Sequence, residues 1–121
     1  MRYYDTLAEL DRDGFNVIVD KTWEDLSPRD CFDDAVSDLD KMCQDIDEGR
    51  LDWFMLRVRV MHEDLELAAE YLGGMLYSDA SECLLDGSAE DLISSAIDAA
   101  KKRIPTLVEG LSKLSVDKQA V

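Results

Sequence analysis

The hydrophobic positions of this chain recur with two spacings, and each spacing predicts a different kind of element. From Pro28 to Glu48 the apolar residues return every three or four positions, as in an amphipathic helix. Ser27 can cap this helix, Pro28 suits its first turn, and Gly49 can end it. With about 100° per residue, one arc holds the apolar residues Cys31, Phe32, Ala35, Val36, Leu39, Met42, Cys43 and Ile46.

The opposite arc of the same segment is made of carboxylates, and only Lys41 interrupts it. We expect the helix to pack on a sheet through Phe32, Leu39 and Ile46 and to turn its acidic arc to solvent. The acidic residues of that arc are the candidate partner-binding residues: Asp30, Asp33, Asp34, Asp38, Asp40, Asp45, Asp47 and Glu48.

Strict alternation of apolar and polar residues marks the segments 52–62 and 65–71 and predicts two strands of a hairpin. Glu63-Asp64 would form a two-residue turn, although this dipeptide is a weak turn signal and a longer loop is left open. The two-residue turn gives a register in which Val60 pairs with Leu67, Val58 with Ala69, Leu56 with Tyr71, and Arg57 with Glu70.

The remaining pattern completes an α+β fold: a small antiparallel sheet of about three strands packed against amphipathic helices. We expect one domain over residues 1–114 and a flexible tail over 115–121. The other expected elements are a short helix over 6–13 ended by Gly14, a strand over 15–19, a bulge or bend at Gly73-Gly74 before a short strand over 75–77, a short helix over 79–86 closed by Gly87, and a helix from Ser88 that Pro105 breaks or kinks before a further helical stretch over 106–114.

Charge changes this picture, because 28 Asp and Glu residues face 13 Lys and Arg residues and give a net charge of −15. Residues 1–52 hold sixteen acids and six bases, and residues 53–121 hold twelve acids and seven bases. We therefore place the centre of the acidic excess at residues 30–52. So much like charge costs stability through self-repulsion, which predicts that the protein uses it.

The chemistry-bearing residues predict a protein that is not an enzyme and that holds no cofactor and no stoichiometric metal. His62 is the only histidine, and we expect it to be a surface residue of the turn. Cys31, Cys43 and Cys83 lack metal-ligand spacing and are expected to be free, buried thiols. An EF-hand calcium loop started at Asp38 or Asp45 misplaces the acids and the glycine that the loop needs.

The lengths of the apolar stretches and the net charge bear on where the protein is located and what it binds. No stretch approaches the roughly 20 apolar residues of a membrane-spanning helix, and the N-terminus has no apolar signal region, so we expect a cytoplasmic protein that does not bind membranes. A strongly anionic surface repels nucleic acid, which disfavours direct binding and favours a basic partner protein.

A rigid row of carboxylates can itself occupy a groove of Lys and Arg that is built for a nucleic-acid backbone. Side chains one helical turn apart lie about 6 Å from each other, a scale similar to the spacing of phosphates along a strand. Asp is a poor helix former, and like charges at i,i+4, as in Asp30/Asp34 and Asp34/Asp38, destabilise a helix. The array is therefore costly, and we interpret it as a mimic of nucleic-acid charge.

Small size, high acidity, Asp-rich helices and a small α+β core resemble phage- and plasmid-encoded anti-restriction and anti-CRISPR proteins. The segments 53–60 and 71–77 also resemble small accessory proteins of mobile elements. The resemblance implies inhibition of a host-defence nucleoprotein, a CRISPR or restriction complex, by blocking its DNA- or RNA-binding cleft.

An alternative is left open: an acidic adaptor or structural protein of a mobile element that binds through apolar surface. Its contact would be a hairpin edge with Trp53 and Met55, and it could be an oligomer. Salt separates the two, since charge mimicry weakens steeply with salt and apolar association does not.

Overall fold

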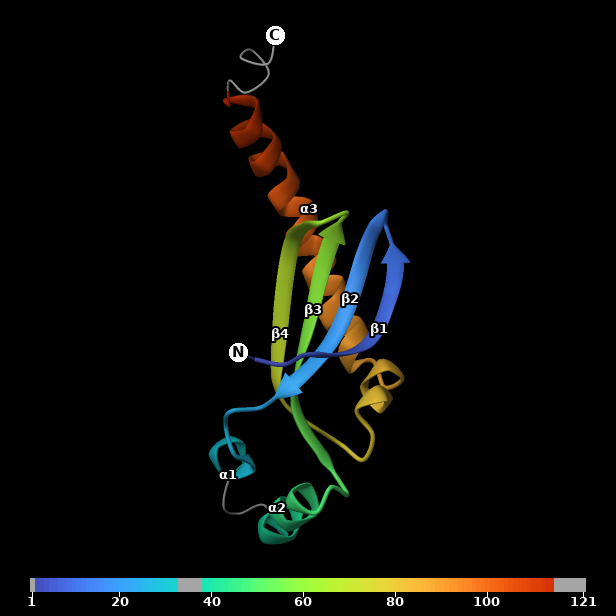
Figure 1. Ribbon diagram of the computed structural model, residues 1–121, viewed down its shortest axis with the longest axis vertical. Coiled ribbons are helices and arrows are strands. Elements are labelled where there is room, and N and C mark those ends of the chain that lie inside the picture. The colour runs from blue at the N-terminus through green and yellow to red at the C-terminus, as the bar shows by residue number, and fades with distance from the viewer. Residues whose placement is uncertain (1, 33–37, 115–121) are drawn as a thin grey trace.

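Four strands in consecutive order form the sheet at the centre of the fold, so the protein is α+β with an antiparallel β1-β2-β3-β4 sheet (Figure 1). The computed structural model describes residues 2–32 and 38–114. The elements are β1 (Asp5–Arg12), β2 (Phe15–Trp23), α1 (Pro28–Cys31), α2 (Leu39–Asp47), β3 (Asp52–His62), β4 (Leu65–Tyr77), the 3-10 helix η1 (Ala80–Leu84) and α3 (Ser88–Ser112).

The expected helix over residues 6–13 is wrong, because this segment is strand β1. Asp13 and Gly14 both have positive φ, 55° and 86°, as the central residues of a type I′ hairpin turn require. The turn pairs Arg12 with Phe15 and Leu10 with Val17, so β1 becomes an edge strand. Gly14 therefore closes a hairpin instead of ending a helix, and the sheet has four strands where about three were expected.

The two-residue turn between β3 and β4 is confirmed, but all four residue pairs predicted from it are wrong. His62 pairs with Leu65 and Met61 with Glu66, and then a bulge at Leu67 shifts β4 by one residue. As a result Val60 lies opposite Ala68, and Arg57 lies opposite Tyr71 instead of Glu70. The bulge keeps Leu67 in the core, where it is 5% exposed.

The second predicted irregularity of β4, at Gly73-Gly74, is confirmed by a register shift between Phe54 and Leu56 of β3. Gly74 has φ 68°, and its N–H donates to the Glu24 carboxylate at 2.9 Å. A Cβ on Gly73 would come within 2.5 Å of the same carboxylate, so glycine lets Glu24 approach the bulge.

The core lies between the sheet and α3, which covers one face of it (Figure 1). α3 contributes small and β-branched residues at helical spacing, and the alternation of β3 places its apolar positions in the same core as predicted. The fully or nearly fully buried side chains include Val17 and Val19 of β2, Phe54, Leu56, Val58 and Val60 of β3, and Ala89, Ile93, Ala96, Ile97 and Ala100 of α3.

The predicted helix over residues 28–48 is not continuous, and it is not the core helix. After α1, Phe32 adopts an extended conformation, and before α2, Asp38 has a left-handed φ of 66°. Repulsion among closely spaced Asp residues disfavours one uninterrupted helix, and Asp tolerates the left-handed region. Phe32 contacts the Trp53 ring at 6.0 Å and Leu39 is buried, yet neither Phe32, Leu39 nor Ile46 joins the main core.

The C-terminal helix is longer than predicted, because α3 continues through Pro105 to Ser112. Its start at Ser88 and the short helix before it are confirmed, with Gly87 at φ 93° between them. The predicted tail over 115–121 lies outside the described residues. No helix in the described part of the chain is long and apolar enough to cross a membrane.

The three cysteines are free, but only one is buried as expected. Cys83 is buried in the core, Cys43 is half-buried and Cys31 is exposed. Burial is the main reason that the pKa of the Cys83 thiol is raised. His62 is exposed at the end of β3, as predicted.

Candidate functional site

Six of the eight carboxylates predicted to form one acidic face are described; they lie at the α1–α2 end of the molecule and have different roles. Asp30 completes a capping box: its carboxylate accepts the backbone N–H of Ser27 at 2.9 Å, while Ser27 Oγ accepts the N–H of Arg29 at 3.1 Å. Arg29 also forms an ion pair with Asp40, which ties α1 to α2.

Asp45 is held by two cations, and 15% of its side chain is exposed. Lys41 Nζ lies 3.3 Å from its carboxylate, and Arg50 Nε donates to it at 2.8 Å. The hydrogen bond from Arg50 is the main reason that the pKa of Asp45 lies below its ordinary value. Arg50 also pairs with Glu48, so both carboxylates help to close the C-terminal end of α2.

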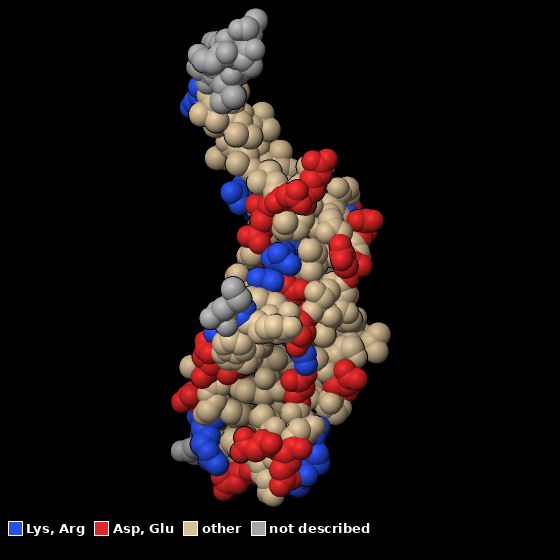
Figure 2. Space-filling view, viewed as in Figure 1, with Lys and Arg blue, Asp and Glu red and all other residues tan. Residues whose placement is uncertain are grey.

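Two of the predicted carboxylates, Asp38 and Asp47, are exposed and make no ion pair within the described ranges. Asp33 and Asp34 lie outside the described residues. At this end of the molecule blue side chains stand beside the red ones (Figure 2). The acidic face is thus interleaved with bases and does not form the single helical array that the sequence predicted. Its role in partner binding stays a prediction.

A longer stretch of acidic residues, without Lys or Arg in the sequence between them, lies elsewhere in the chain. Residues 63–100 contain ten acidic residues and no Lys or Arg, whereas residues 28–50 contain eight acids and three bases. This run covers β4, η1 and the first half of α3. The net charge of residues 53–121 conceals this run, because Arg57, Arg59 and the basic residues 101–103 fall in the same segment. The ten acids are Glu63, Asp64, Glu66, Glu70, Asp79, Glu82, Asp86, Glu90, Asp91 and Asp98.

Half of these ten carboxylates have local structural partners. Asp79 caps η1 by accepting the N–H of Ser81 at 3.0 Å, and this bond is the main reason that its pKa is lowered. Glu82 completes the capping box of η1. The other three interactions are Glu70 with Ser95 Oγ, Asp86 with Tyr77 Oη, and Glu90 with Arg12.

The other five carboxylates of this run are exposed and form no ion pair within the part of the chain that the structure describes. They fall in two groups, one at the β3–β4 turn and one on the solvent side of α3. The first group is Glu63, Asp64 and Glu66, and the second is Asp91 and Asp98. We refer to these five as the unpaired carboxylates.

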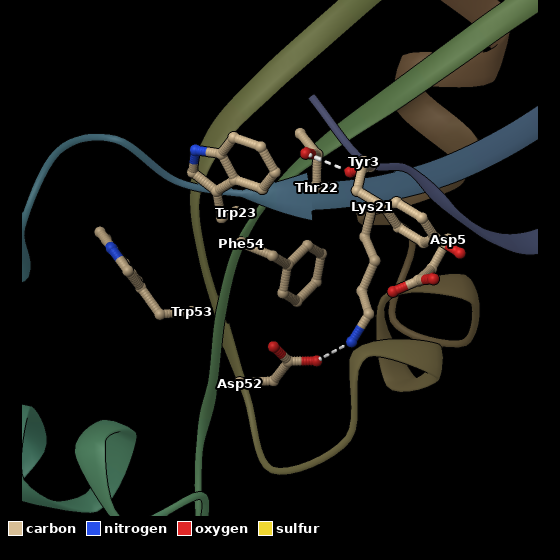
Figure 3. Close-up of a pocket in the computed structure, with 8 residues that line it drawn as sticks. All are labelled: Tyr3, Asp5, Lys21, Thr22, Trp23, Asp52, Trp53 and Phe54. Atoms are coloured by element: carbon tan, nitrogen blue, oxygen red, sulfur yellow. Dashed lines mark hydrogen bonds and ion pairs between the residues drawn. The ribbon is translucent and has the colours of Figure 1, made fainter. Parts of the chain in front are cut away.

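A pocket of about 300 Å³ opens between the N-terminal segment and the start of β3. Figure 3 shows Lys21 extending past the Phe54 ring to form an ion pair with Asp52. Tyr3, Trp23 and Trp53 also line the pocket and give it aromatic surface. The described lining holds no Cys, His or Ser, so it offers no nucleophile of those kinds, and the lysine is already paired.

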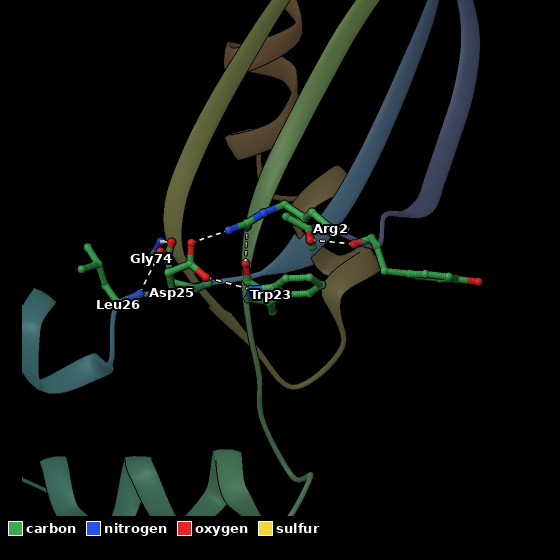
Figure 4. Close-up of polar contacts among 8 residues, drawn as sticks. Arg2, Trp23, Asp25, Leu26 and Gly74 are labelled. Carbon is green, nitrogen blue, oxygen red and sulfur yellow. Dashed lines mark hydrogen bonds and ion pairs between the residues drawn. The ribbon is translucent and has the colours of Figure 1, made fainter.

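The aromatic residues beside this pocket are fixed by polar contacts (Figure 4). Trp23 Nε1 donates to Asp25 at 2.8 Å, and Arg2 both pairs with Asp25 and lies 4.8 Å from the centroid of the Trp23 ring. Trp53 Nε1 donates to the carbonyl of Leu26 at 2.8 Å. Trp53 and Met55 lie on β3, an interior strand, so the predicted binding edge made of these residues is wrong.

A charged cluster on the sheet face opposite α3 was not predicted. Asp20 is 1% exposed, accepts Arg57 Nε at 3.0 Å, and lies 3.5 Å from Arg59. The Arg57 guanidinium also lies 3.4 Å from the centroid of the Tyr4 ring. The alternation over 52–62 placed Arg57 and Arg59 away from the core, but the expected strand over 15–19 ended before Asp20. That the three residues meet depends on the register between β2 and β3, which the sequence did not predict.

Comparison with known proteins gives no further guide, since no family model, curated protein or solved structure matches the chain. Within residues 2–32 and 38–114, no group of three or more His, Cys, Asp or Glu side chains is placed to hold a metal ion. Surface charge and exposed apolar side chains are therefore the features of the described residues that bear on function.

Proposed function

We propose that this protein is a non-catalytic inhibitor whose carboxylates occupy the nucleic-acid-binding cleft of a basic partner. The partner class is a host-defence nucleoprotein, a CRISPR or restriction complex, in the cytoplasm. One observation carries the proposal: residues 63–100 contain ten Asp and Glu residues and no Lys or Arg, in a chain of net charge −15. The carboxylates of this run that form no ion pair attract a Lys- and Arg-lined cleft over the same range as nucleic acid does, and they release the same counterions from it.

The structure changes which carboxylates the proposal uses. In the α1–α2 region, Asp38 and Asp47 are available to a partner, while Asp30, Asp40, Asp45 and Glu48 also have structural roles. On α3, Asp91 and Asp98 lie seven residues apart and hence about 10 Å along one side of the helix. These two pairs of carboxylates define two alternative contact surfaces.

The test begins with affinity capture from a nuclease-treated bacterial lysate and elution with a salt gradient. We expect nucleic-acid-binding proteins of basic surface to elute at high salt, and we expect duplex DNA or RNA to displace the protein from them. A captured partner that holds nucleic acid and this protein at the same time, without competition, contradicts the proposal.

Three variants that each remove two charges then locate the surface. One is Asp91→Asn with Asp98→Asn, and the second is Asp38→Asn with Asp47→Asn. A matched control, Glu9→Gln with Asp11→Asn, removes two exposed acids from the edge strand β1. One of the first two variants is expected to lower affinity and flatten its salt dependence more than the control, because exposed pairs contribute about 0.2–1 kcal/mol each. Equal effects of all three would contradict a defined contact surface.

A second candidate function, an adaptor that binds through apolar surface, is favoured by exposed apolar side chains at the end of α3. Val108 is 60% exposed and Leu111 is 57% exposed. An adaptor of this kind would keep its affinity at high salt, so the same salt gradient separates the two candidates.

A further inference from the structure

The C-terminal part of α3 projects beyond the ends of the strands and leaves an apolar groove beside it. Figure 1 shows the helix continuing past both the β1–β2 and the β3–β4 turns. The groove encloses about 320 Å³ between this projection and the first residues of β4. Leu65 is 48% exposed there, and Val108 and Leu111 are exposed by more than half. Large apolar side chains gathered in one concave surface are typical of an interaction site.

The helix side of the groove has the spacing of a helix-pairing stripe. Ile104, Leu107, Val108 and Leu111 occupy positions i, i+3, i+4 and i+7, and all four line the groove. Leu65 and Leu67 of β4 form the facing wall. From Ile104 to Leu111 the stripe is about 10 Å long, so it offers two turns of helix as a contact surface.

The rim of the groove on the β3–β4 side is formed by the turn residues Glu63 and Asp64, which connect the lining residues His62 and Leu65. Both acids are exposed and unpaired as described above, and red side chains gather beside the mostly uncharged projection (Figure 2). Of the bases that flank the stripe, Lys101, Arg103 and Lys113 are engaged within the chain, whereas Lys102 is exposed and forms no ion pair in the described residues. Lys101 Nζ lies 2.8 Å from Asp13, and Arg103 donates to the carbonyl of Leu67 at 3.1 Å.

We propose that this groove binds an amphipathic helix of a partner protein, with an apolar stripe facing α3 and Lys or Arg residues facing the acidic rim. Apolar contact would supply the affinity, and the rim would select for basic flanks. A second copy of the chain fits less well, because it would bring the same unpaired acids to the interface in a molecule that already carries −15. The inference does not depend on the proposed mimicry of nucleic acid.

Synthetic helical peptides can test this on the full-length protein by fluorescence anisotropy. The probe carries Leu at i, i+3, i+4 and i+7 and Lys at the other positions. One control peptide has the same composition in scrambled order, and another keeps the Leu spacing with Glu in place of Lys. We expect saturable binding at one site for the probe, about tenfold weaker binding of the scrambled peptide, and still weaker binding of the Glu peptide.

Variants separate the groove from general attraction to an acidic protein. Val108→Ser with Leu111→Ser is expected to weaken probe binding about tenfold and to leave the circular dichroism spectrum unchanged, because both side chains are exposed. Glu63→Gln with Asp64→Asn is expected to weaken binding and flatten its salt dependence. The matched control, Glu9→Gln with Asp11→Asn, removes two exposed charges from β1, at the edge of the sheet opposite β4, and is expected to have little effect.

Three results would overturn the proposal. The scrambled peptide could bind as tightly as the probe, or the control variant could lose as much affinity as the rim variant, and both results would reduce the effect to net charge. Alternatively, sedimentation velocity could show a dimer that Leu111→Ser dissociates, which would make a second copy the occupant. None of these results bears on competition with nucleic acid, so the two proposals fail separately.

Discussion

Asp20 shows how a single buried carboxylate can organise the open face of the sheet. It lies on β2 and is almost completely buried, with Arg57 and Arg59 of β3 as its cationic neighbours. Thr6 of β1 adds a hydrogen bond at 3.4 Å. A buried charge without a partner is costly, so this cluster helps to fix the pairing of three strands.

The two sides of this ion pair are expected to respond unequally to mutation. Arg57→Met leaves the buried Asp20 carboxylate with Arg59, at 3.5 Å, as its one described cationic neighbour, and breaking a buried pair in this way costs about 3–5 kcal/mol. Asp20→Asn leaves Arg57, whose side chain is 15% exposed, in contact with water and should cost about 1–3 kcal/mol. Urea unfolding of both variants and of the double variant measures the difference. Equal losses would show that burial of Asp20 does not set the cost.

Tyr77 links the end of β4 to the start of α3 through two polar contacts. Its hydroxyl donates to the carboxylate of Asp86 and lies 3.0 Å from Ser88 Oγ. The bond from Tyr77 is the main reason that the pKa of Asp86 lies below its ordinary value of 3.8, followed by the bond from the Ser88 backbone. The Tyr77 ring packs against Phe54 at 6.0 Å and would keep this contact as phenylalanine.

Tyr77→Phe is therefore expected to raise the pKa of Asp86 toward its ordinary value, as followed by carbon NMR of the carboxyl group. Because the folded pKa is lowered, the contact stabilises the native state above the unfolded pKa and is lost as pH falls through the folded pKa. The variant should be less stable than the parent at pH 7, and the difference should vanish in acid. Tyr71→Phe, at an exposed tyrosine on the opposite sheet face, is the control. An unchanged Asp86 pKa in Tyr77→Phe would contradict this assignment.

At the level of elements, the sequence predicted those parts of the fold that depend on local pattern. The alternation over 52–62 identifies β3 and its buried face, and Gly73-Gly74 marks a bulge that the structure contains. The wrong prediction of a helix at β1 has a local cause as well. Asp13-Gly14 is a strong hairpin signal, but the amphipathic pattern before it also fits a short helix that Gly14 would end.

The candidate site depended on longer-range facts that a helical projection does not contain. A wheel drawn over residues 28–48 assumes an unbroken helix, whereas Asp38 is left-handed and Phe32 is extended. It also cannot show that Arg50, which follows the helix, turns back to Asp45. α3 packs on the sheet through Ala and Ile residues, which allow a close approach, and the two form the main core. α2 lies outside that core, at the end of the molecule.

Because α3 belongs to the main core and α2 does not, a charge buried in α3 is expected to destabilise the protein more than a charge buried in α2. Ile97→Asp puts an unpaired carboxylate into the main core, where Ile97 is 4% exposed, and is expected to unfold the protein. Leu39→Asp affects a residue that is 7% exposed but lies outside that core, so it should loosen α1 and α2 only. Hydrogen exchange would show lost protection in α2 and retained protection in β2, β3 and α3. Leu39→Met is the conservative control, and global unfolding of Leu39→Asp would place Leu39 in the main core.

For the whole molecule, the balance between attraction and repulsion of charges decides how ionic strength acts. Most of the described ion pairs are at least partly exposed, as in Arg12–Glu90 and Lys101–Asp13, and exposed pairs contribute little. Against them stands the self-repulsion of a chain with net charge −15, to which the unpaired carboxylates contribute. Both effects are screened by salt, so the sign of the salt dependence shows which is larger.

We expect repulsion to be larger, so that the melting temperature rises by roughly 2–6 °C between low salt and about 0.5 M NaCl. Neutralising exposed acids that form no ion pair in the described chain, as in Asp47→Asn with Glu66→Gln, should raise the melting temperature at low salt and flatten its dependence on NaCl. Lys102→Gln is the matched test of opposite sign, because Lys102 is exposed and makes no ion pair within the described residues. Its loss makes the chain more negative, so it should lower the melting temperature at low salt and steepen the dependence. A melting temperature that falls on addition of salt would mean that the ion pairs outweigh the repulsion. The acidic excess would then carry no cost to stability, and the inference that its cost implies a use would fail.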